Sequence, residues 1–476
     1  MQATVRVLSD DELGRIHEET LKILHHTGVR VDTARGRKFL KKAGANVDEA
    51  SHIVHFPPRL VEEALKQAPK DFCLNGRRPT SSIPMNQAKC AIVLDGSAVH
   101  TYDVSLQARR PATLEDWYLA TRLGDSLEEI DVYWSMIEGC WGHSPGDTVA
   151  YWRAIFENFS KHIQDATMTV EESRWMLEVL QVVCGGRDEV RRANPVSFVL
   201  CPASPLIIEG EYTDAYLETL DWGLPAAVMT MPLLGISAPA SLISELVLAN
   251  CETLAMLCLI QSAAPGTPFI YSAVPVVADM RSGRYGSGEV ENSLLGAAIT
   301  EIARMYRLPV ESTVGGSDHH MPCIQAGYER AVNYTLPVLS MPDLLVAPGL
   351  LGGSTVFSPE QLLIDVEIIR RCKRISQGIG SEAGQWLGEV IAMLGPGGNY
   401  LAHPTTRRLV RSGEVYFSSM GLHGTYEKWE KSGSPDLISE LRAEIQHRIS
   451  TYTPLPLPEE AERELTFLEK RARASG

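Results

Sequence analysis

Three adjacent polar residues, Asp318, His319 and His320, lie in the segment 311–329, ESTVGGSDHHMPCIQAGYE. Side chains of these types can bind protons, cations or metal ions. The segment is typical of a buried strand, a glycine turn and the start of a helix, since glycine permits a sharp turn of the backbone. In α/β folds the functional groups lie just after the carboxyl ends of the strands, which is where this segment places the three polar residues. An acidic helix N-cap beside two surface histidines is the alternative, and the spacing leaves both open.

Aromatic residues follow other expected strands. Trp134, Trp141 and Tyr271 are candidates for a cage whose ring faces hold a cationic ligand, with Glu138 as a carboxylate in the same region. The alternative for each ring is that it fills the end of the hydrophobic core. Residues after the expected strands are rich in aromatic and sulfur side chains, and the few carboxylates there are chiefly Glu138, Asp165, Glu311 and Asp318.

Metal binding is a weaker interpretation of the same residues. His319, His320 and Cys323 have donor atoms that zinc accepts, but adjacent histidines point in different directions. A zinc site would need a ligand from another strand, for example Cys201 or His162. The nine cysteines form no CxxC pair and are expected to be mostly buried and reduced. No GxSxG, HExxH or GxGxxG motif occurs, which disfavours hydrolase chemistry and dinucleotide binding.

The elements that must position these residues alternate along the chain. Short apolar runs are separated by amphipathic stretches of helical period, a pattern that predicts a parallel sheet covered on both faces. Seven runs are expected to be strands and AIVLDG (91–96) is a candidate eighth: 131–137, 161–167, 195–202, 225–232, 268–275, 309–316 and 343–350. Seven or eight such units favour an α/β fold of the (β/α)8 barrel type.

The barrel is expected to carry extensions at both ends. Residues 1–75 predict a helical N-terminal unit, beginning with a capping box at Ser9 and Glu12. Residues 76–380 comprise the barrel, including an entry β-hairpin within IVLDGSAVHTYD. Residues 381–476 form a helical C-terminal segment, which we expect to wrap the barrel or form an interface.

Bulk properties exclude several classes of protein. The formal net charge of −15 leaves no basic surplus to neutralise phosphates, so nucleic acid is not expected as a partner. Hydrophobic residues make up 44% of the chain, enough for a sizeable core. No run of about 18 uninterrupted apolar residues occurs, and the N-terminus lacks the apolar region of a signal peptide. A cytoplasmic protein that does not engage a membrane is therefore expected.

Four segments resemble segments of the trimethylamine methyltransferase family. They occur in the same order as in the family and together span most of the chain. They are DDELGRIHEETLKILHHTGVRV (10–31), GGSDHHMPCIQAGYERA (315–331), FSPEQLLIDVEIIRR (357–371) and LGPGGNYLAHPTTRR (394–408). The chain also departs from the family. Many relatives carry a small residue and a lysine where this chain has His319 and His320, and VAPGLLGGSTV differs from the relatives' glycine-rich form.

The resemblance implies a (β/α)8 barrel that moves a methyl group from a methylated amine to the cobalt of a separate corrinoid protein. Family members without pyrrolysine are associated with quaternary amines, and all 476 positions here hold standard residues. We therefore expect a small quaternary amine as substrate, with glycine betaine as the default. The corrinoid (cobalamin) is expected from a partner protein or free in solution, with no tightly bound metal, and the protein is expected to form a homo-oligomer.

The site follows from this assignment. Aromatic faces and a few carboxylates bind a cation without fixing a proton, so Trp134, Glu138, Trp141 and Tyr271 are expected to bind substrate. His319 is expected to donate to a betaine carboxylate, and Asp318 and His320 are the candidate catalytic residues. Two alternatives remain open: a zinc-assisted methyltransferase for a thiol- or oxygen-bound methyl group, and a non-catalytic barrel that binds betaines or docks a corrinoid protein.

Overall fold

An eight-stranded parallel barrel forms the centre of the molecule. The computed structural model describes residues 4–346, 348–421 and 423–475. The strands follow one another in the sheet in chain order, and a parallel bridge between Tyr271 and Val310 joins its two edges. The strands are β6 (Ala91–Val93), β9 (Ile130–Tyr133), β10 (His162–Asp165), β11 (Val196–Leu200), β13 (Ala226–Val228), β15 (Phe269–Tyr271), β18 (Glu311–Thr313) and β19 (Leu344–Val346). Every strand predicted from the apolar runs, including the eighth, is confirmed, because fully buried parallel strands are apolar on both faces.

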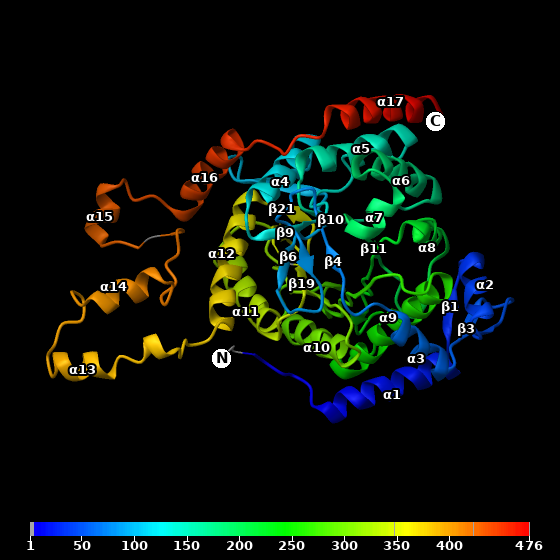
Figure 1. Ribbon diagram of the computed structural model, residues 1–476, viewed down its shortest axis with the longest axis horizontal. Coiled ribbons are helices and arrows are strands. Elements are labelled where there is room, and N and C mark those ends of the chain that lie inside the picture. Colours follow the sequence, from blue (N-terminus) through cyan, green and yellow to red (C-terminus); the bar gives the residue numbers. More distant parts are fainter. Residues whose placement is uncertain (1–3, 347, 422, 476) are drawn as a thin grey trace.

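Helices surround the barrel in a ring (Figure 1). They are α4 (Leu114–Ser126), α5 (Pro145–Asn158), α6 (Val170–Cys184), α7 (Arg187–Ala193), α8 (Gly210–Leu217), α9 (Leu242–Ala263), α10 (Glu291–Met305), α11 (Ile324–Ser340) and α12 (Pro359–Ser376). Several begin where the sequence predicts a cap. The side chain of Ser358, for example, accepts from the backbone N–H of Gln361 at the start of α12.

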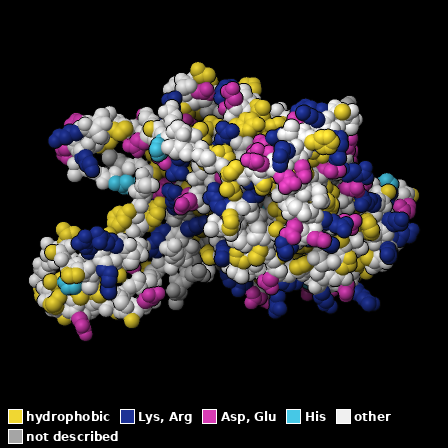
Figure 2. All heavy atoms as spheres, turned by 45° about the horizontal axis from the view of Figure 1, so that its top comes forward, with side chains coloured by type: hydrophobic (Ala, Val, Ile, Leu, Met, Phe, Trp, Pro, Cys, Tyr) yellow, Lys and Arg dark blue, Asp and Glu magenta, His cyan; other side chains and the backbone are white. Residues whose placement is uncertain are grey.

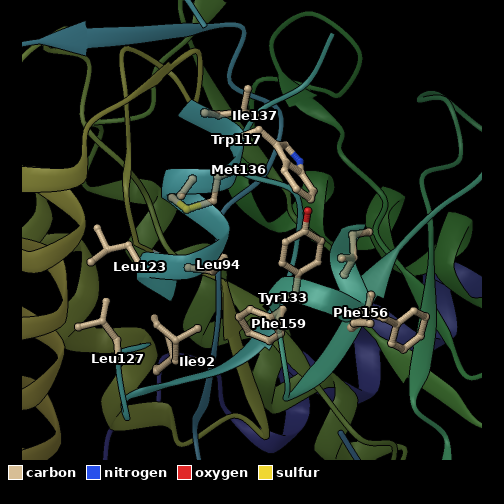
Figure 3. Close-up of a cluster of buried hydrophobic side chains, with 14 of the residues drawn as sticks. Ile92, Leu94, Trp117, Leu123, Leu127, Tyr133, Met136, Ile137, Phe156 and Phe159 are labelled. Carbon is tan, nitrogen blue, oxygen red and sulfur yellow. The ribbon is translucent and has the colours of Figure 1, made fainter. Parts of the chain in front are cut away.

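The core between the sheet and the helices is aromatic where α4 and α5 cover β9. Figure 3 shows Tyr133 near Phe159 and below Trp117. The rings of Tyr133 and Phe159 are 5.3 Å apart, and all three side chains are buried. Trp117 extends this cluster to Trp141 beyond the end of β9, with ring centroids 5.2 Å apart and an interplanar angle of 79°. The hydrophobic core therefore supports the ring of Trp141, one of the candidate site residues, directly.

The N-terminal unit combines helices with short strands. Its elements are α1 (Asp10–His26), β1 (Val29–Val31), α2 (Ala34–Lys42), β2 (Asn46–Val47), β3 (Ile53–His55) and α3 (Pro58–Gln67). The capping box of Ser9 and Glu12 is present. The strand β1 pairs in parallel with β12 (Ile207–Ile208), which lies in the loop after β11. Because one sheet contains strands from both regions, the N-terminal unit is joined to the barrel by backbone hydrogen bonds.

Helix α9 is apolar around most of its circumference because it is covered on both sides. Helices α1, α2 and α3 all contact it, and its buried side chains share a hydrophobic cluster with those of β13 and β15 in the barrel. It has the length and hydropathy of a membrane-spanning helix, but 83% of that window is buried inside the molecule. Burial between two layers explains the composition of α9 without a membrane.

The predicted hairpin within IVLDGSAVHTYD is wrong in its pairing. The strand β6, which contains the first part of that segment, pairs with β9 and β19 in the barrel. Its second part forms β7 (His100–Asp103), which pairs antiparallel with β8 (Ala108–Pro111). The physical reason is that an interior barrel strand uses its backbone groups on both sides and has none left for a hairpin partner.

Other short strands lie in loops around the barrel. They are β4 (Cys73–Leu74) with β5 (Ile83–Pro84), β14 (Leu233–Leu234), β16 (Val276–Asp279) and β17 (Arg284–Tyr285), and β20 (Leu350–Leu351) with β21 (Val356–Phe357).

The C-terminal segment has two parts. Helices α13 (Gly388–Leu394), α14 (Pro404–Arg411) and α15 (Tyr426–Lys431) project away from the ring, at the left of Figure 1. Helices α16 (Leu437–Thr451) and α17 (Glu459–Ser475) return to the barrel and pack against α4, α5, α6 and α12. The predicted extent of the C-terminal unit as a domain stays a prediction.

Candidate substrate site at the carboxyl ends of the strands

A cavity of about 550 Å³ lies at the carboxyl ends of β9, β10 and β11. Its aromatic lining consists of Trp134, Trp141, Tyr151, Trp152 and Tyr212, and its carboxylates are Glu138, Asp165, Glu172 and Glu209. None of the described residues that line this cavity is Lys or Arg. We call it the aromatic cavity. Trp134, Glu138 and Trp141 were predicted from the sequence as substrate-binding residues, and the structure brings all three together here.

The aromatic wall is built from edge-to-face contacts. The ring of Trp141 lies 5.7 Å from that of Tyr151 at an interplanar angle of 63°. The indole nitrogen Nε1 of Trp141 is buried and has no hydrogen-bond partner among the described residues. Edge-to-face packing fixes the rings in orientation, which preserves the position of their electron-rich faces.

A glycine provides the space for Trp134. A Cβ atom added to Gly96, just after β6, would lie only 2.7 Å from the indole ring of Trp134. The close approach requires a residue without a side chain. Gly96 therefore sets the position of one cavity wall from a neighbouring strand, without itself lining the cavity.

Two carboxyl groups in the aromatic cavity have raised pKa values. Burial raises the pKa of Asp165 to about 6, although Asp165 accepts hydrogen bonds from the Tyr151 hydroxyl at 2.5 Å and from the Ala166 N–H at 2.8 Å. Glu138 lines the cavity and is exposed to solvent. Loss of solvent against the surrounding protein, followed by the charge of Asp165, raises the pKa of Glu138 to about 8.

The raised pKa values of Glu138 and Asp165 indicate that no positive charge lies beside these two carboxyl groups. Two neighbouring carboxylates in a partly dehydrated cavity repel each other, so one of them retains its proton near neutral pH. A bound cation would remove that penalty by pairing with the ionised form. The arrangement of aromatic faces and carboxyl groups, without Lys or Arg among the described lining residues, is suited to a small organic cation.

The polar residues Asp318 and His320 line a different cavity, of about 940 Å³, which we call the basic cavity. Its other walls include Arg109 on β8 and Arg284 on β17. Loss of solvent, followed by the positive charge of Arg109, lowers the pKa of His320. The aromatic and basic cavities share no lining residue. The structure thus separates the predicted catalytic residues from the predicted substrate-binding residues.

The glycine turn that precedes these residues has the predicted form. It links β18 to α11, and a Cβ atom on Gly316 would lie 2.3 Å from Oγ of Ser287. Asp318 accepts a hydrogen bond from the N–H of Ser287 at 2.8 Å. The imidazole Nδ1 of His319 is within 3.1 Å of the Met321 carbonyl oxygen. His319 is therefore engaged locally and does not line either cavity.

Tyr271, the fourth predicted substrate-binding residue, lies outside the aromatic cavity. Its side chain is fully buried, and its hydroxyl donates to Oδ1 of Asn250 on α9 at 2.9 Å. It belongs to the layer between sheet and helices, whereas its neighbour Ile270 faces the barrel interior. Alternation of side chains along a strand explains the difference.

The zinc ligands considered in the sequence are not assembled. Cys201 lines the aromatic cavity, whereas His320 lines the basic cavity. His162 is buried, with Nε2 at 2.9 Å from the hydroxyl of Ser197. Within the described ranges no group of three or more His, Cys, Asp or Glu residues is placed to hold a metal ion. The geometry thus offers no specific support for the zinc alternative.

Tyr151 and Tyr212 are functional candidates that the sequence did not single out. They come from α5 and α8 rather than from strand ends. Tyr151 follows the capping box at Ser144 by two turns, so it lies near the helix N-terminus that faces the cavity end of the barrel. The only available signal was the aromatic content of the YW pair at 151–152.

Fold and site together define a (β/α)8-barrel protein with an aromatic, carboxylate-lined cavity at the carboxyl ends of its strands. The model of one family, described as trimethylamine methyltransferase (MTTB), matches residues 1–476. The chain belongs to this family and is a methyltransferase, of a kind that works with corrinoid proteins.

Several named relatives are similar over nearly their whole length. The trimethylamine methyltransferase MttB2 of Methanosarcina mazei is 30% identical, over 95% of this chain and 92% of its own. The trimethylamine methyltransferase MttB of Desulfitobacterium hafniense (strain DSM 10664 / DCB-2) is 28% identical, over 95% of this chain and 90% of its own. The glycine betaine methyltransferase of D. hafniense (strain Y51) is 25% identical, over 99% and 98%. A crystal structure titled as the hydroxylamine MtmB complex superposes with a TM-score of 0.49 at 12% identity, covering 98% and 94%.

Proposed function

We propose that this protein transfers a methyl group from a small quaternary amine, glycine betaine by default, to the cobalt(I) of a corrinoid protein. The observation that carries the proposal is the aromatic cavity, in which Trp134, Trp141 and Glu138 are assembled without a Lys or Arg among the described lining residues. A quaternary ammonium ion is matched by aromatic faces and carboxylates, since it offers no N–H group to hydrogen-bond.

The protein's task in this reaction is positioning rather than proton transfer. A quaternary amine leaves as a neutral tertiary amine once its methyl group departs, so no acid is needed to activate the leaving group. The aromatic rings hold the cation, and the raised pKa values of Glu138 and Asp165 favour a bound positive charge over an empty site. The methyl acceptor is brought by the partner, which supplies the nucleophile for an in-line displacement.

For Asp318 and His320 we propose a role at the basic cavity, on the side of the barrel from which the methyl acceptor approaches. Arg109 and Arg284 give this cavity a positive character in a chain of formal net charge −15. Among the described residues of the aromatic cavity, the basic side chain that a betaine carboxylate could meet is His143. The indole Nε1 of Trp141, which has no hydrogen-bond partner among the described residues, is a further donor near it.

A ligand panel tests the substrate class. Glycine betaine, carnitine and choline are compared with trimethylamine and with 3,3-dimethylbutan-1-ol, an uncharged analogue of choline of the same shape. We expect a quaternary amine at millimolar concentration to raise the melting temperature and the uncharged analogue to leave it unchanged. Absence of any shift with every quaternary amine would contradict the substrate assignment.

A single-turnover assay tests the reaction itself. The protein is mixed with the stabilising amine and with reduced free cob(I)alamin or a corrinoid protein, and methylcobalt formation is followed by absorbance. One demethylated amine is expected for each methylcobalt formed. Binding of the amine without methyl transfer to either acceptor would favour the non-catalytic alternative.

A further inference from the structure

The charged side chains that line the aromatic cavity are nearly all acidic. Among the described lining residues the basic side chain is His143, and the acidic ones are Glu138, Asp165, Glu172 and Glu209. On the molecular face drawn in Figure 2, by contrast, Lys and Arg side chains are interspersed with Asp and Glu. The acidic lining is therefore a local property of the cavity, which the formal net charge of −15 does not by itself explain.

Asp165 is the carboxyl group whose ionised form the surrounding protein stabilises. Its side chain is buried, and each of its oxygens has a donor: Oδ2 accepts from the Tyr151 hydroxyl at 2.5 Å and Oδ1 from the Ala166 N–H at 2.8 Å. Donors in these positions favour the charged form of a carboxyl group. With a pKa of about 6, Asp165 is ionised at pH 7.5 in spite of its burial. The cavity therefore holds a fixed negative charge beside its aromatic rings.

His143 does not offset this charge. Its side chain is 85% exposed, and its Nδ1 lies 3.3 Å from Oε1 of Glu172. The carboxylate of Glu172 also accepts hydrogen bonds from the N–H groups of Met168 and Thr169 at the start of α6. The imidazole thus lies at the exposed rim, where it faces a carboxylate that the chain already holds in place.

The neutral donor of the cavity wall is suited to a hydroxyl oxygen. Nε1 of Trp141 is buried and has no hydrogen-bond partner among the described residues. One donor satisfies the oxygen of an alcohol, whereas an ionised carboxylate has about four lone-pair sites and requires several donors. The wall therefore matches a ligand with a neutral polar group better than one with a carboxylate.

The structure of glycine betaine brings its two charges into the same space. A single CH2 group separates its ammonium from its carboxylate, so both must enter the aromatic cavity together. The carboxylate would lose water near Asp165 without gaining an Arg or Lys partner among the described lining residues. Arg109 and Arg284 line the basic cavity instead. Unpaired and like charges of this kind are how a binding site rejects a competing ligand.

We propose that the aromatic cavity selects quaternary amines of net positive charge, such as choline and tetramethylammonium, over zwitterionic betaines. This inference rests on the proposed function and narrows it, because it places choline-type donors before glycine betaine. With choline as the donor, the C–N bond breaks with its electron pair remaining on nitrogen. The methyl group passes to the reduced corrinoid, the product is 2-(dimethylamino)ethanol, and no proton is transferred.

Isothermal titration of the native protein with a matched pair of ligands tests the selection. Glycine betaine is compared with its amide, which has the same shape but carries a neutral carboxamide in place of the carboxylate. At pH 7.5 and constant ionic strength we expect the amide and choline to bind about tenfold more tightly than glycine betaine, or better. Glycine betaine that binds as tightly as its amide would overturn this inference and leave the proposed function standing. Absence of binding by all three ligands would overturn both.

Glu209→Lys supplies the missing basic group from an exposed position. Glu209 precedes α8, and its side chain makes no capping hydrogen bond, so the substitution is expected to leave the fold intact. We expect the preference for the amide over glycine betaine to fall about fivefold or more, with the neutral variant Glu209→Gln as the matched control that changes it less. A gain in affinity for glycine betaine cannot result from misfolding. An unchanged preference in Glu209→Lys would count against the proposal.

Asp165→Asn tests the fixed charge itself. The variant is expected to bind choline about tenfold more weakly and glycine betaine no more weakly than the native protein, so that the preference is lost. Asp188→Asn, at an exposed position on α7, is the control and should keep the preference. Circular dichroism confirms that each variant is folded. An equal loss of affinity for both ligands in folded Asp165→Asn would assign this residue a structural role and overturn the selection by its charge.

Discussion

Glu138 is the residue on which the electrostatics of the aromatic cavity depend. It lies between Trp134 and Trp141 in the sequence and shares the cavity with Asp165. Its pKa, raised to about 8, means that it carries a proton at neutral pH in the free protein. A cation binds best to the ionised form, so substrate binding and proton release at this residue are linked.

Replacement of Glu138 by Gln is expected to lower the affinity for a quaternary amine about tenfold at pH 9, or about 1.4 kcal/mol. In the native protein the affinity should rise as the pH increases from 6.5 through about 8, since ionisation of Glu138 provides the partner charge. The variant should lose this pH dependence. Isothermal titration at several pH values measures both effects. Glu171→Gln on the exposed start of α6 is the control, and an unchanged pH profile in Glu138→Gln would contradict the linkage.

Gly96→Ala tests the position of Trp134. The added Cβ would meet the indole ring at 2.7 Å, so the ring must move and the cation-binding face with it. We expect a several-fold loss of affinity together with a destabilisation of about 1–3 kcal/mol from overpacking. Gly14→Ala on α1, where nothing lies within 4 Å of the added atom, serves as the matched control. Equal affinities in both variants would show that Trp134 does not shape the site.

At the scale of strands and helices, the sequence predicts where chemistry can occur but not always which side chain faces it. Trp134, Glu138 and Trp141 follow β9, and that fact alone was enough to predict that they lie at the cavity. Tyr271 ends β15 in the same way but faces outward toward α9, because its orientation depends on alternation within a strand of only three residues. An uncertainty of one residue in the strand register reverses such a prediction.

Helical contributions to the site were harder to predict. Tyr151 and Tyr212 enter the aromatic cavity from α5 and α8, whose rotation about their axes is set by packing against the sheet and α6. The separation of Asp318 and His320 from the aromatic residues was likewise hidden, since the sequence gives the order of the strands but not the distance between loops around the barrel. The fold itself was predictable because eight apolar runs recur at regular spacing.

Glu311 on β18 is buried in the barrel interior, where Oε1 accepts from Nε2 of Gln164 at 2.7 Å. Burial raises its pKa to about 7. Glu311→Gln preserves the acceptor and removes the ionisation. We expect a melting temperature about 1–3 °C higher than that of the native protein at pH 8.5 and no difference at pH 5. Scanning calorimetry at the two pH values measures this, and a lower melting temperature at pH 8.5 would show that the ionised form is required.

For the whole molecule, buried acids determine how stability depends on pH. Among the residues that the structure describes, six carboxyl groups have pKa values raised to between about 6 and 8: Asp95, Glu138, Asp165, Glu245, Glu252 and Glu311. A raised folded-state pKa means that the native state binds protons more tightly than the unfolded chain. The resulting stabilisation is complete below about pH 4 and is lost as the pH rises through 6 to 8.

The free energy of unfolding is therefore expected to decrease between pH 5.5 and 8.5. Urea unfolding at constant ionic strength measures this trend across the range. A quaternary amine should offset part of the loss at the alkaline end, since it binds the ionised form of Glu138. A free energy of unfolding that increases toward pH 8.5 would show that ionisable groups other than these buried acids dominate the pH dependence of stability.

The two cavities are built from different loops, those after β9, β10 and β11 and those around β8, β17 and α11. Substitutions in one wall therefore leave the other wall's contacts intact, and their energetic effects should add when combined. Under the proposed function, choice of methyl donor and recognition of methyl acceptor would be separately heritable traits. On that proposal, a lineage on this scaffold would change what it demethylates by altering residues 134–143 while its partner continued to fit.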